Sequence, residues 1–366
     1  MKSDLRILLS FFCFVCIDFT LASKAFSVEC WLGTITDILT LEEGNGPGQV
    51  MYQEAEPVSL HVPSFDVDRE GRFYICDPGN SRIQVFSSNG IFLRQIELRK
   101  AMDNSRFRGW YSDLAVDLES NIYLTDSAIP RARNNKSIGA RDYYRILKFN
   151  SRGEFEEIIK LPSVKSKSGC GVSTDYYGIL YVQVNQDSMR IYDKRSKLIS
   201  AFGVTYRPYP PAEAQVVQRG DSLARIVFIK GDYVCLTSLD DIKKGTVMDS
   251  IPLPLKLKYS HADFIGIDNN LNIYFSINHR LTKPGGYPGV LKNEWHVTSL
   301  HRYWIWGSKL LESGQVWLNF TNDFTDNKRE ERATNFTKQY IVSGDGSVFF
   351  LHGTIDNLIL SIVTFE

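Results

Sequence analysis

The stretch Pro63–Phe86, PSFDVDREGRFYICDPGNSRIQVF, predicts a β-hairpin followed by a third strand. Bulky strand-forming residues flank Glu70-Gly71, which supplies a tight reversal of the chain. Asp77-Pro78-Gly79-Asn80 is a second turn, because Pro presets φ and Gly or Asn tolerates positive φ. Arg82–Phe86 then alternates polar and apolar residues, as a half-buried strand does. With a fourth strand over Ile91–Leu98, the stretch opens a four-stranded antiparallel meander.

The same pattern recurs along the chain. An Asp stands six residues before a Tyr in four copies: Asp68 and Tyr74, Asp117 and Tyr123, Asp175 and Tyr181, and Asp268 and Tyr274. Two further copies are placed at Ala224–Leu236, with Ala224–Ile229 as its first strand, and at Gln339–Phe365. A repeat of roughly 50 residues made of short strands is typical of a β-propeller with one sheet per copy. We therefore predict an all-β fold, a six-bladed β-propeller of four-stranded antiparallel blades.

The first copy resembles an NHL repeat. The resemblance rests on the Asp68 turn with Gly71, the pair Phe73-Tyr74, and the run Asn80–Phe86. It is close in the first copy, fair in the next two, and reduced to the Asp–Tyr hairpin in the later ones. The resemblance implies a six-bladed scaffold, and it implies no reaction, since propellers carry both binding proteins and enzymes.

The ends of the chain are expected to close the ring. The last copy finishes with Leu358–Phe365 as its third strand, so it lacks an outer strand. An open ring would leave two exposed sheet edges. We predict that Trp31–Leu41 lies beside Leu358–Phe365 and supplies the missing strand.

The first 25 residues have the features of a secretory signal peptide. Lys2 and Arg6 precede an apolar run, Ile7–Ile17, and small residues follow up to Ala25. We expect residues 1–25 to be removed and residues 26–366 to form one propeller domain that is periplasmic, extracellular or envelope-associated, with no stable membrane span. An uncleaved membrane anchor is the alternative.

The charge balance and the cysteine spacing argue against a nucleic-acid-binding protein and against a CxxC metal or redox site. The chain has 42 basic and 42 acidic residues, so no overall field favours nucleic acid. The cysteines that follow the signal peptide are widely spaced and form no CxxC motif. Cys76 and Cys235 are expected to be buried thiols on equivalent strands. The recurring Asp residues, Asp77 and Asp126 included, are interpreted as turn residues that accept backbone N–H bonds.

Two insertions lie between strands. Ser127–Arg141 is basic, and it is either a solvated loop or a rim that binds an anion or a partner. Asn278–Trp306 is rich in aromatic residues and His, and it is either a packed strand or a ligand platform.

Ligands of propellers favour the central channel, where the innermost strands converge. Six residues are candidates for its mouth: His61, Ser64, Asp113, Arg225, His261 and Asp263. We predict a binding module for a protein, glycan or small-molecule ligand, without a cofactor. The alternative is a metal-dependent hydrolase or lyase, lactonase-like or amidating-lyase-like, with one zinc or calcium ion. It would use His61, Asp113, Arg225, His261 and Asp263.

Overall fold

The computed structural model describes the chain in segments that consist mainly of β-strands. They comprise residues 33–51, 63–98, 107–130, 143–161, 171–174, 178–185, 188–203, 215–217, 225–230, 232–238, 241, 249–254, 257, 261–282, 294–306, 309–318, 340–353 and 357–365. No helix in these segments has the length and hydropathy that a bilayer crossing requires.

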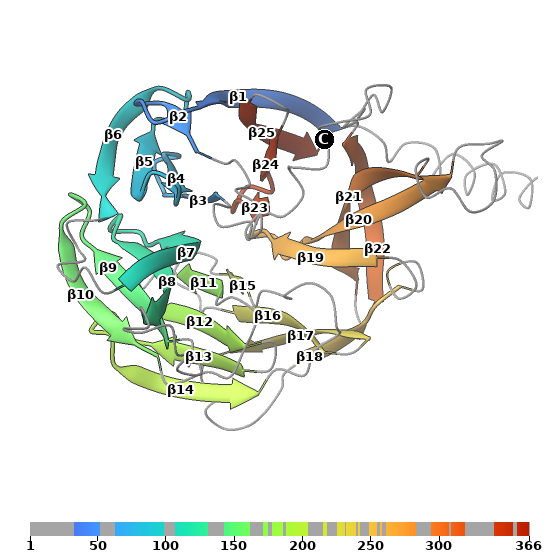
Figure 1. Cartoon of the computed structure of the whole chain (residues 1–366). Coiled ribbons are helices and arrows are strands. Elements are labelled where there is room, and N and C mark those ends of the chain that lie inside the picture. Colours follow the sequence, from blue (N-terminus) through green and yellow to red (C-terminus); the bar gives the residue numbers. More distant parts are fainter. Residues whose placement is uncertain are drawn as a thin grey trace, which may run out of the picture.

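The strands form sheets arranged around a common centre (Figure 1). Blade 1 contains β3 (Ser64–Val67), β4 (Phe73–Asp77), β5 (Arg82–Phe86) and β6 (Phe92–Glu97). Blade 2 contains β7 (Phe107–Val116), β8 (Ile122–Pro130), β9 (Tyr143–Phe149) and β10 (Phe155–Lys160). Blade 3 contains β11 (Gly171–Thr174), β12 (Leu180–Asn185), β13 (Ser188–Tyr192) and β14 (Leu198–Gly203).

Two more four-stranded blades follow, and then the sheet that closes the ring. Blade 4 contains β15 (Gln215–Val217), β16 (Arg225–Lys230), β17 (Tyr233–Ser238) and β18 (Asp249–Pro252). Blade 5 contains β19 (His261–Ile267), β20 (Ile273–Thr282), β21 (Glu294–Trp306) and β22 (Lys309–Leu318). The closing sheet contains β23 (Tyr340–Val342), β24 (Val348–Gly353), β25 (Asn357–Phe365), β1 (Gly33–Glu43) and β2 (Gln49–Val50).

The N-terminal strand closes the ring, as the sequence predicted. Strand β1 pairs antiparallel with β25 from Gly33 opposite Phe365 to Glu42 opposite Asn357. The expectation of six four-stranded blades is wrong in its strand count, because five sheets are four-stranded and the closing sheet has a fifth strand. After Glu43 the chain turns back, and β2 pairs in parallel with the end of β1.

The fourth sheet corrects the sequence-based assignment of its innermost strand. Ala224–Ile229 was expected there, but β15 is innermost, and β16 is the second strand, paired on both sides. The apolar run of β16 suits a central strand, whereas the three residues of β15 carry little periodic signal. Cys235 accordingly lies on a third strand and Cys76 on a second, so they are not equivalent, although both thiols are buried as expected.

The Asp–Tyr repeat is a structural feature of the first hairpin of a blade. Asp68 Oδ1 accepts the N–H groups of Glu70 and Arg72, at 2.9 and 3.0 Å, and Tyr74 donates its hydroxyl to Asp68 Oδ2 at 3.1 Å. Asp117 with Tyr123, and Asp268 with Tyr274, repeat the hydroxyl bond at 3.2 and 2.9 Å. This confirms the turn interpretation for these three residues; Asp175 lies outside the described residues.

Each of these turns needs one residue with a left-handed backbone. Gly71 takes φ 73° without strain, whereas Leu271 holds φ 64° at the same turn position in blade 5. A Leu in this conformation costs about 1–2 kcal/mol, which the Asp268 hydrogen bonds must offset.

We expect Asp268→Ala to lower the free energy of unfolding by about 2–3 kcal/mol, because it leaves turn N–H groups and the buried Tyr274 hydroxyl without their acceptor. Asp193→Ala is the matched control: Asp193 accepts the same pair of turn N–H groups, from Arg195 and Lys197, in an exposed turn. Chemical denaturation of both variants measures the difference. Equal losses would contradict a role for the tyrosine bond.

Apolar side chains fill the spaces between neighbouring sheets. The cluster between the closing sheet and blade 1 includes Leu41, Phe65, Phe73, Leu358 and Leu360, each at most 1% exposed. Because this cluster joins residues from both ends of the chain, its burial stabilises the closed ring.

Candidate functional site

Strand direction sorts the turns of each sheet onto two faces of the ring. In blade 1, Ser64 begins β3 opposite Cys76, so the start of the innermost strand lies on the same face as the turn from β4 to β5. The turns from first to second strands gather on the other face, where Arg72 Nη2 donates to Ser120 Oγ at 2.9 Å across blades. Asn269 N likewise donates to Gly344 O at 3.1 Å between blade 5 and the closing sheet.

On the side where the innermost strands begin, two of the described hairpins extend beyond the four-stranded part of their blades. In blade 2, Phe107–Trp110 pairs with Ser127–Pro130, and β9 adds Tyr143 and Tyr144. We call these ten residues the blade-2 arm. In blade 5, His279–Thr282 pairs with Glu294–Val297 beyond the reach of β22, whose last pairing is Leu318 with Thr298. These eight residues are the blade-5 arm.

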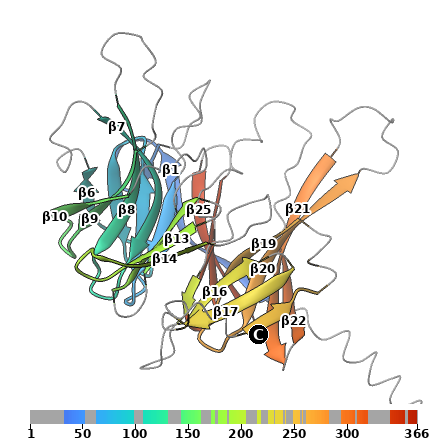
Figure 2. The same ribbon diagram turned by 90° about the horizontal axis from the view of Figure 1, so that it is seen from below.

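Both arms rise on the same side of the ring (Figure 2). Two sheets separate blade 2 from blade 5 in either direction around the ring, so the arms stand on opposite sides of its centre. We call this side, on which the innermost strands begin, the arm face. The described parts of the two insertions, residues 127–130 and 278–282 with 294–306, therefore begin on the side where the innermost strands start.

Three innermost strands hold four of the six candidate residues. Ser64 begins β3, Asp113 lies within β7, and His261 and Asp263 lie at the start of β19. Arg225 is not with them: it begins a second strand, β16, and therefore lies toward the opposite face. His61 lies outside the described residues.

The carboxylate of Asp113 is committed to backbone hydrogen bonds. It is fully buried; Oδ1 accepts Leu114 N at 2.8 Å, and Oδ2 accepts Val172 N from the innermost strand of blade 3 at 2.7 Å. Asp66 does the same one blade earlier, with Val67 N at 2.9 Å and Val116 N at 2.8 Å. We call Asp66 and Asp113 the carboxylate clamps, because each joins two adjacent innermost strands.

The clamps change the interpretation of Asp113. A carboxylate whose two oxygens accept buried N–H groups loses those bonds if it moves to coordinate a metal ion. Within the described residues, no group of three or more His, Cys, Asp or Glu side chains is arranged to hold a metal ion. Sequence analysis missed Asp66, for which the signal was its place two residues before the turn Asp.

A buried Ser–His–Glu array lies in blade 5 and was also missed. Ser299 Oγ is 2.7 Å from His301 Nε2, and His301 Nδ1 is 2.5 Å from Glu312 Oε1. The order of groups is that of a hydrolase triad. However, Ser299 and His301 are 0% exposed, so a substrate cannot reach the hydroxyl, and the array acts as a polar network within the sheet. The spacing Ser-x-His on one strand is the signal that sequence analysis could have used.

A second polar array, in which the serine lies between the histidine and the acid, spans the ring closure. His352 Nε2 on β24 is 2.8 Å from Ser361 Oγ on β25, and Ser361 donates to Asp37 Oδ1 on β1 at 2.5 Å. Burial lowers the pKa of His352 below its usual 6.5, and the nearby Asp37 carboxylate partly opposes that effect.

This array predicts a loss of stability in acid. Because the folded-state pKa of His352 is below its unfolded value, the unfolded chain binds the proton more readily, and stability falls as the pH drops below about 6.5. We expect His352→Gln to reduce the difference in Tm between pH 7.5 and pH 5.5. Asp37→Asn should enlarge that difference, since it removes the opposing charge. An unchanged difference in both variants would contradict the assignment.

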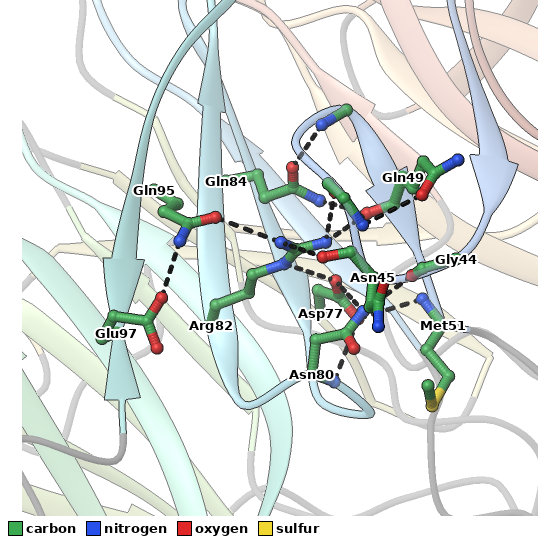
Figure 3. A network of polar contacts seen from close by, with 12 residues as sticks. Gly44, Asn45, Gln49, Met51, Asp77, Asn80, Arg82, Gln84, Gln95 and Glu97 are labelled. Carbon is green, nitrogen blue, oxygen red and sulfur yellow. Dashed lines mark hydrogen bonds and ion pairs between the residues drawn. The ribbon is translucent and has the colours of Figure 1, made fainter.

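An arginine anchors the turn that follows the closing strand (Figure 3). The side chain of Arg82 is almost fully buried and pairs with Asp77, Nε to Oδ2, at 2.9 Å. Its remaining donors reach Asn45 O at 2.9 Å and Gln95 Oε1 at 3.1 Å from Nη1, and Gly46 O at 2.8 Å and Gln49 O at 2.6 Å from Nη2. A guanidinium has five N–H groups, so all of them are used.

The turn Gly44–Gly48 is held at further points. Asn80 Nδ2 donates to Gly44 O at 2.9 Å, and Gly48 N donates to Gln84 Oε1 at 2.8 Å. We call the set of Arg82, Asp77, Asn80 and Gln84 the latch, because it ties the closing sheet to blade 1. The latch lies on the arm face. Asp77 therefore has two roles, since it accepts the turn N–H of Asn80 and also pairs with Arg82.

Comparisons with known proteins establish no family. No family model matches the chain, so the expected membership of the NHL-repeat family is not supported, and no curated protein matches it. Solved structures that resemble it include a catalytically inactive virginiamycin B lyase from Staphylococcus aureus with quinupristin, at 11% identity and TM-score 0.43, and a streptogramin B lyase, at 13% identity and TM-score 0.43. Each alignment covers 92% of this chain and 100% of the other. The fold itself is a β-propeller by its own sheet order.

Proposed function

We propose that this protein is a binding module that recognises its partner on the arm face, between the blade-2 arm and the blade-5 arm. The observation that carries the proposal is that two described hairpins extend beyond their blades on the same face, and that they belong to opposite sheets. Loops and extensions on a rigid scaffold are the usual place for recognition. We also infer that the closing sheet serves as a sixth blade, and that residues 1–25 direct export to the periplasm or the cell exterior.

The scaffold beneath the arms supports this function. The carboxylate clamps and the latch hold neighbouring sheets together through buried, charge-assisted hydrogen bonds. A partner that contacts both arms therefore meets them at a set separation, which lowers the ordering cost of binding. The clamp bonds of Asp113 weigh against the metal-dependent hydrolase or lyase, since that alternative uses Asp113 as a ligand.

The test shortens each arm down to a register pair that remains intact. In one variant an Asn-Gly turn replaces residues 127–144, between the paired Asp126 and Arg145, so that only Phe107–Trp110 of the blade-2 arm is left. In the other it replaces residues 279–297, between the paired Asn278 and Thr298. The control variant, Arg69→Glu with Glu119→Lys, changes exposed turns on the opposite face.

Chemical cross-linking of the purified proteins to the native exported fraction, followed by mass spectrometry, gives the readout. We expect the wild type and the control to capture the same molecules, and either arm deletion to abolish that capture while the protein keeps its thermal unfolding transition. Capture that survives both deletions would overturn the proposal.

A further inference from the structure

A buried acceptor near the start of blade 3 lacks a hydrogen-bond partner. The side chain of Gln183, on β12, is 6% exposed, and its Oε1 atom accepts no hydrogen bond from the described residues. A buried polar atom that stays unsatisfied costs free energy, so this acceptor points to a donor that a ligand supplies. Gln183 is the register partner of Gly171, which begins the innermost strand β11 on the arm face.

Gly171 leaves a space beside this acceptor. A Cβ atom at residue 171 would lie 3.8 Å from Gln183 Oε1 and 3.8 Å from Asp113 Oδ2. The nearest heavy atom of another described residue would be Gln183 Cβ, at 3.7 Å. Gly171 itself is only half-buried, so a small group can approach this position from solvent. Two oxygen atoms from different blades therefore border a space that residue 171 does not fill.

These two oxygens favour a positively charged hydrogen-bond donor. An amide oxygen only accepts hydrogen bonds, and the fully buried Asp113 carboxylate adds negative charge where attraction is stronger than in water. Asp113 can stay in its clamp, because its charge is needed and not a change of partners. A calcium ion takes about six to eight oxygen ligands, whereas a primary ammonium group presents three N–H donors. The space beside Gly171 therefore suits an ammonium group better than a metal ion.

We propose that the ligand bound on the arm face places a primary ammonium group beside Gly171, where it donates to Gln183 Oε1 and lies near the Asp113 carboxylate. The inference rests on the proposed function, and it names the chemical group that the partner presents. The innermost strands begin on the side from which the arms rise, so a partner held by the arms can reach this position. An ammonium group is a compact charge on a narrow stem, unlike the wider planar guanidinium.

Thermal unfolding with matched cations tests the chemistry. Methylammonium and tetramethylammonium carry the same charge, but only methylammonium has N–H donors. We expect methylammonium to raise the Tm by about 1–3 °C in a saturable manner, relative to tetramethylammonium at the same concentration. Equal shifts would overturn the inference, because charge alone would then suffice. Absence of a shift would overturn it as well, since water would then be the donor to Gln183.

Three variants locate the effect. Gln183→Met removes the acceptor but keeps an unbranched side chain, so the ligand-free protein should keep or raise its Tm while the methylammonium shift disappears. Gly171→Ala fills the space with a methyl group at a φ outside the left-handed region, and it should also abolish the shift without lowering the Tm. The control, Gln315→Met, replaces a glutamine that is also 6% exposed, on β22, and should keep the shift. A shift that survives both site variants would overturn the placement.

Two versions of the capture experiment identify the source of the amine. If a lysine of a macromolecule supplies it, acetylation of the exported fraction should abolish capture. If a small amine supplies it, the low-molecular-mass filtrate should raise the Tm of the wild type and not that of Gln183→Met. Failure of both versions would overturn the inference, while arm-dependent capture that Gln183→Met leaves intact would keep the proposed function standing. A methylammonium shift without arm-dependent capture would contradict the proposed function and leave the ammonium site standing.

Discussion

Arg82→Ala is expected to lower the free energy of unfolding by about 3–5 kcal/mol, the largest effect of any single substitution proposed for this chain. The change leaves the buried Asp77 carboxylate without its ion pair. It also removes the donors to three backbone carbonyl groups, those of Asn45, Gly46 and Gln49. Loss of the latch should also loosen the closing strand. Urea denaturation measures the first effect, and hydrogen exchange of the β1 and β25 amides measures the second.

Two further variants identify the part of this loss that belongs to ring closure. Arg145→Ala breaks the corresponding cross-strand pair in blade 2, where Arg145 Nε donates to Asp126 at 2.6 Å. It should destabilise the protein without accelerating exchange in β1 and β25. Arg82→Lys keeps the charge but has three donors for five acceptors, so its effect should lie between wild type and Ala. Equal exchange in Arg82→Ala and Arg145→Ala would rule out the latch.

Asp113→Ala is expected to cost about 2–4 kcal/mol, because two buried N–H groups, of Leu114 and Val172, lose their acceptors. Asp113→Asn should cost less, since an amide oxygen can still accept one of the bonds. The exposed Glu119→Ala is the control and should change stability by less than about 0.5 kcal/mol. Thermal and urea denaturation of the three variants give the comparison.

The same substitution separates the two roles considered for Asp113. If the residue is a clamp, chelation should leave the Tm of the wild type unchanged, and Asp113→Ala should lower stability equally with and without added zinc or calcium. A metal bound in stoichiometric amount and lost in Asp113→Ala would favour the hydrolase or lyase instead.

Local patterns made much of the fold predictable. The six-residue offset from Asp68 to Tyr74 encodes a hairpin whose carboxylate, turn amides and tyrosine hydroxyl all lie within one short segment. Ring closure was also predictable, because the last repeat lacked one strand and Trp31–Leu41 had a strand pattern; the strand observed is Gly33–Glu43. The weak fourth copy was misassigned, since β15 is short and its pairing depends on β16, which resembles an innermost strand in isolation.

The candidate site was predictable only in part. The sequence indicated strand starts on a common face and two insertions, and four of the six candidates do lie on innermost strands. Arg225 lies toward the other face because the fourth blade begins one strand earlier than its sequence suggested. The extent of the arms depends on pairing beyond the four-stranded sheets, and residue type does not reveal it.

By itself, then, the sequence determined the repeating hairpin, the all-β class and the strand that closes the ring, because these depend on neighbours within a few dozen residues or on a missing repeat unit. Tertiary structure alone decided that Asp113 bonds to Val172, that Arg82 holds the turn Gly44–Gly48, and that two arms share one face. The physical reason is that these features involve different sheets. The packing of whole sheets against one another sets which buried polar groups meet and which hairpins lie on one face.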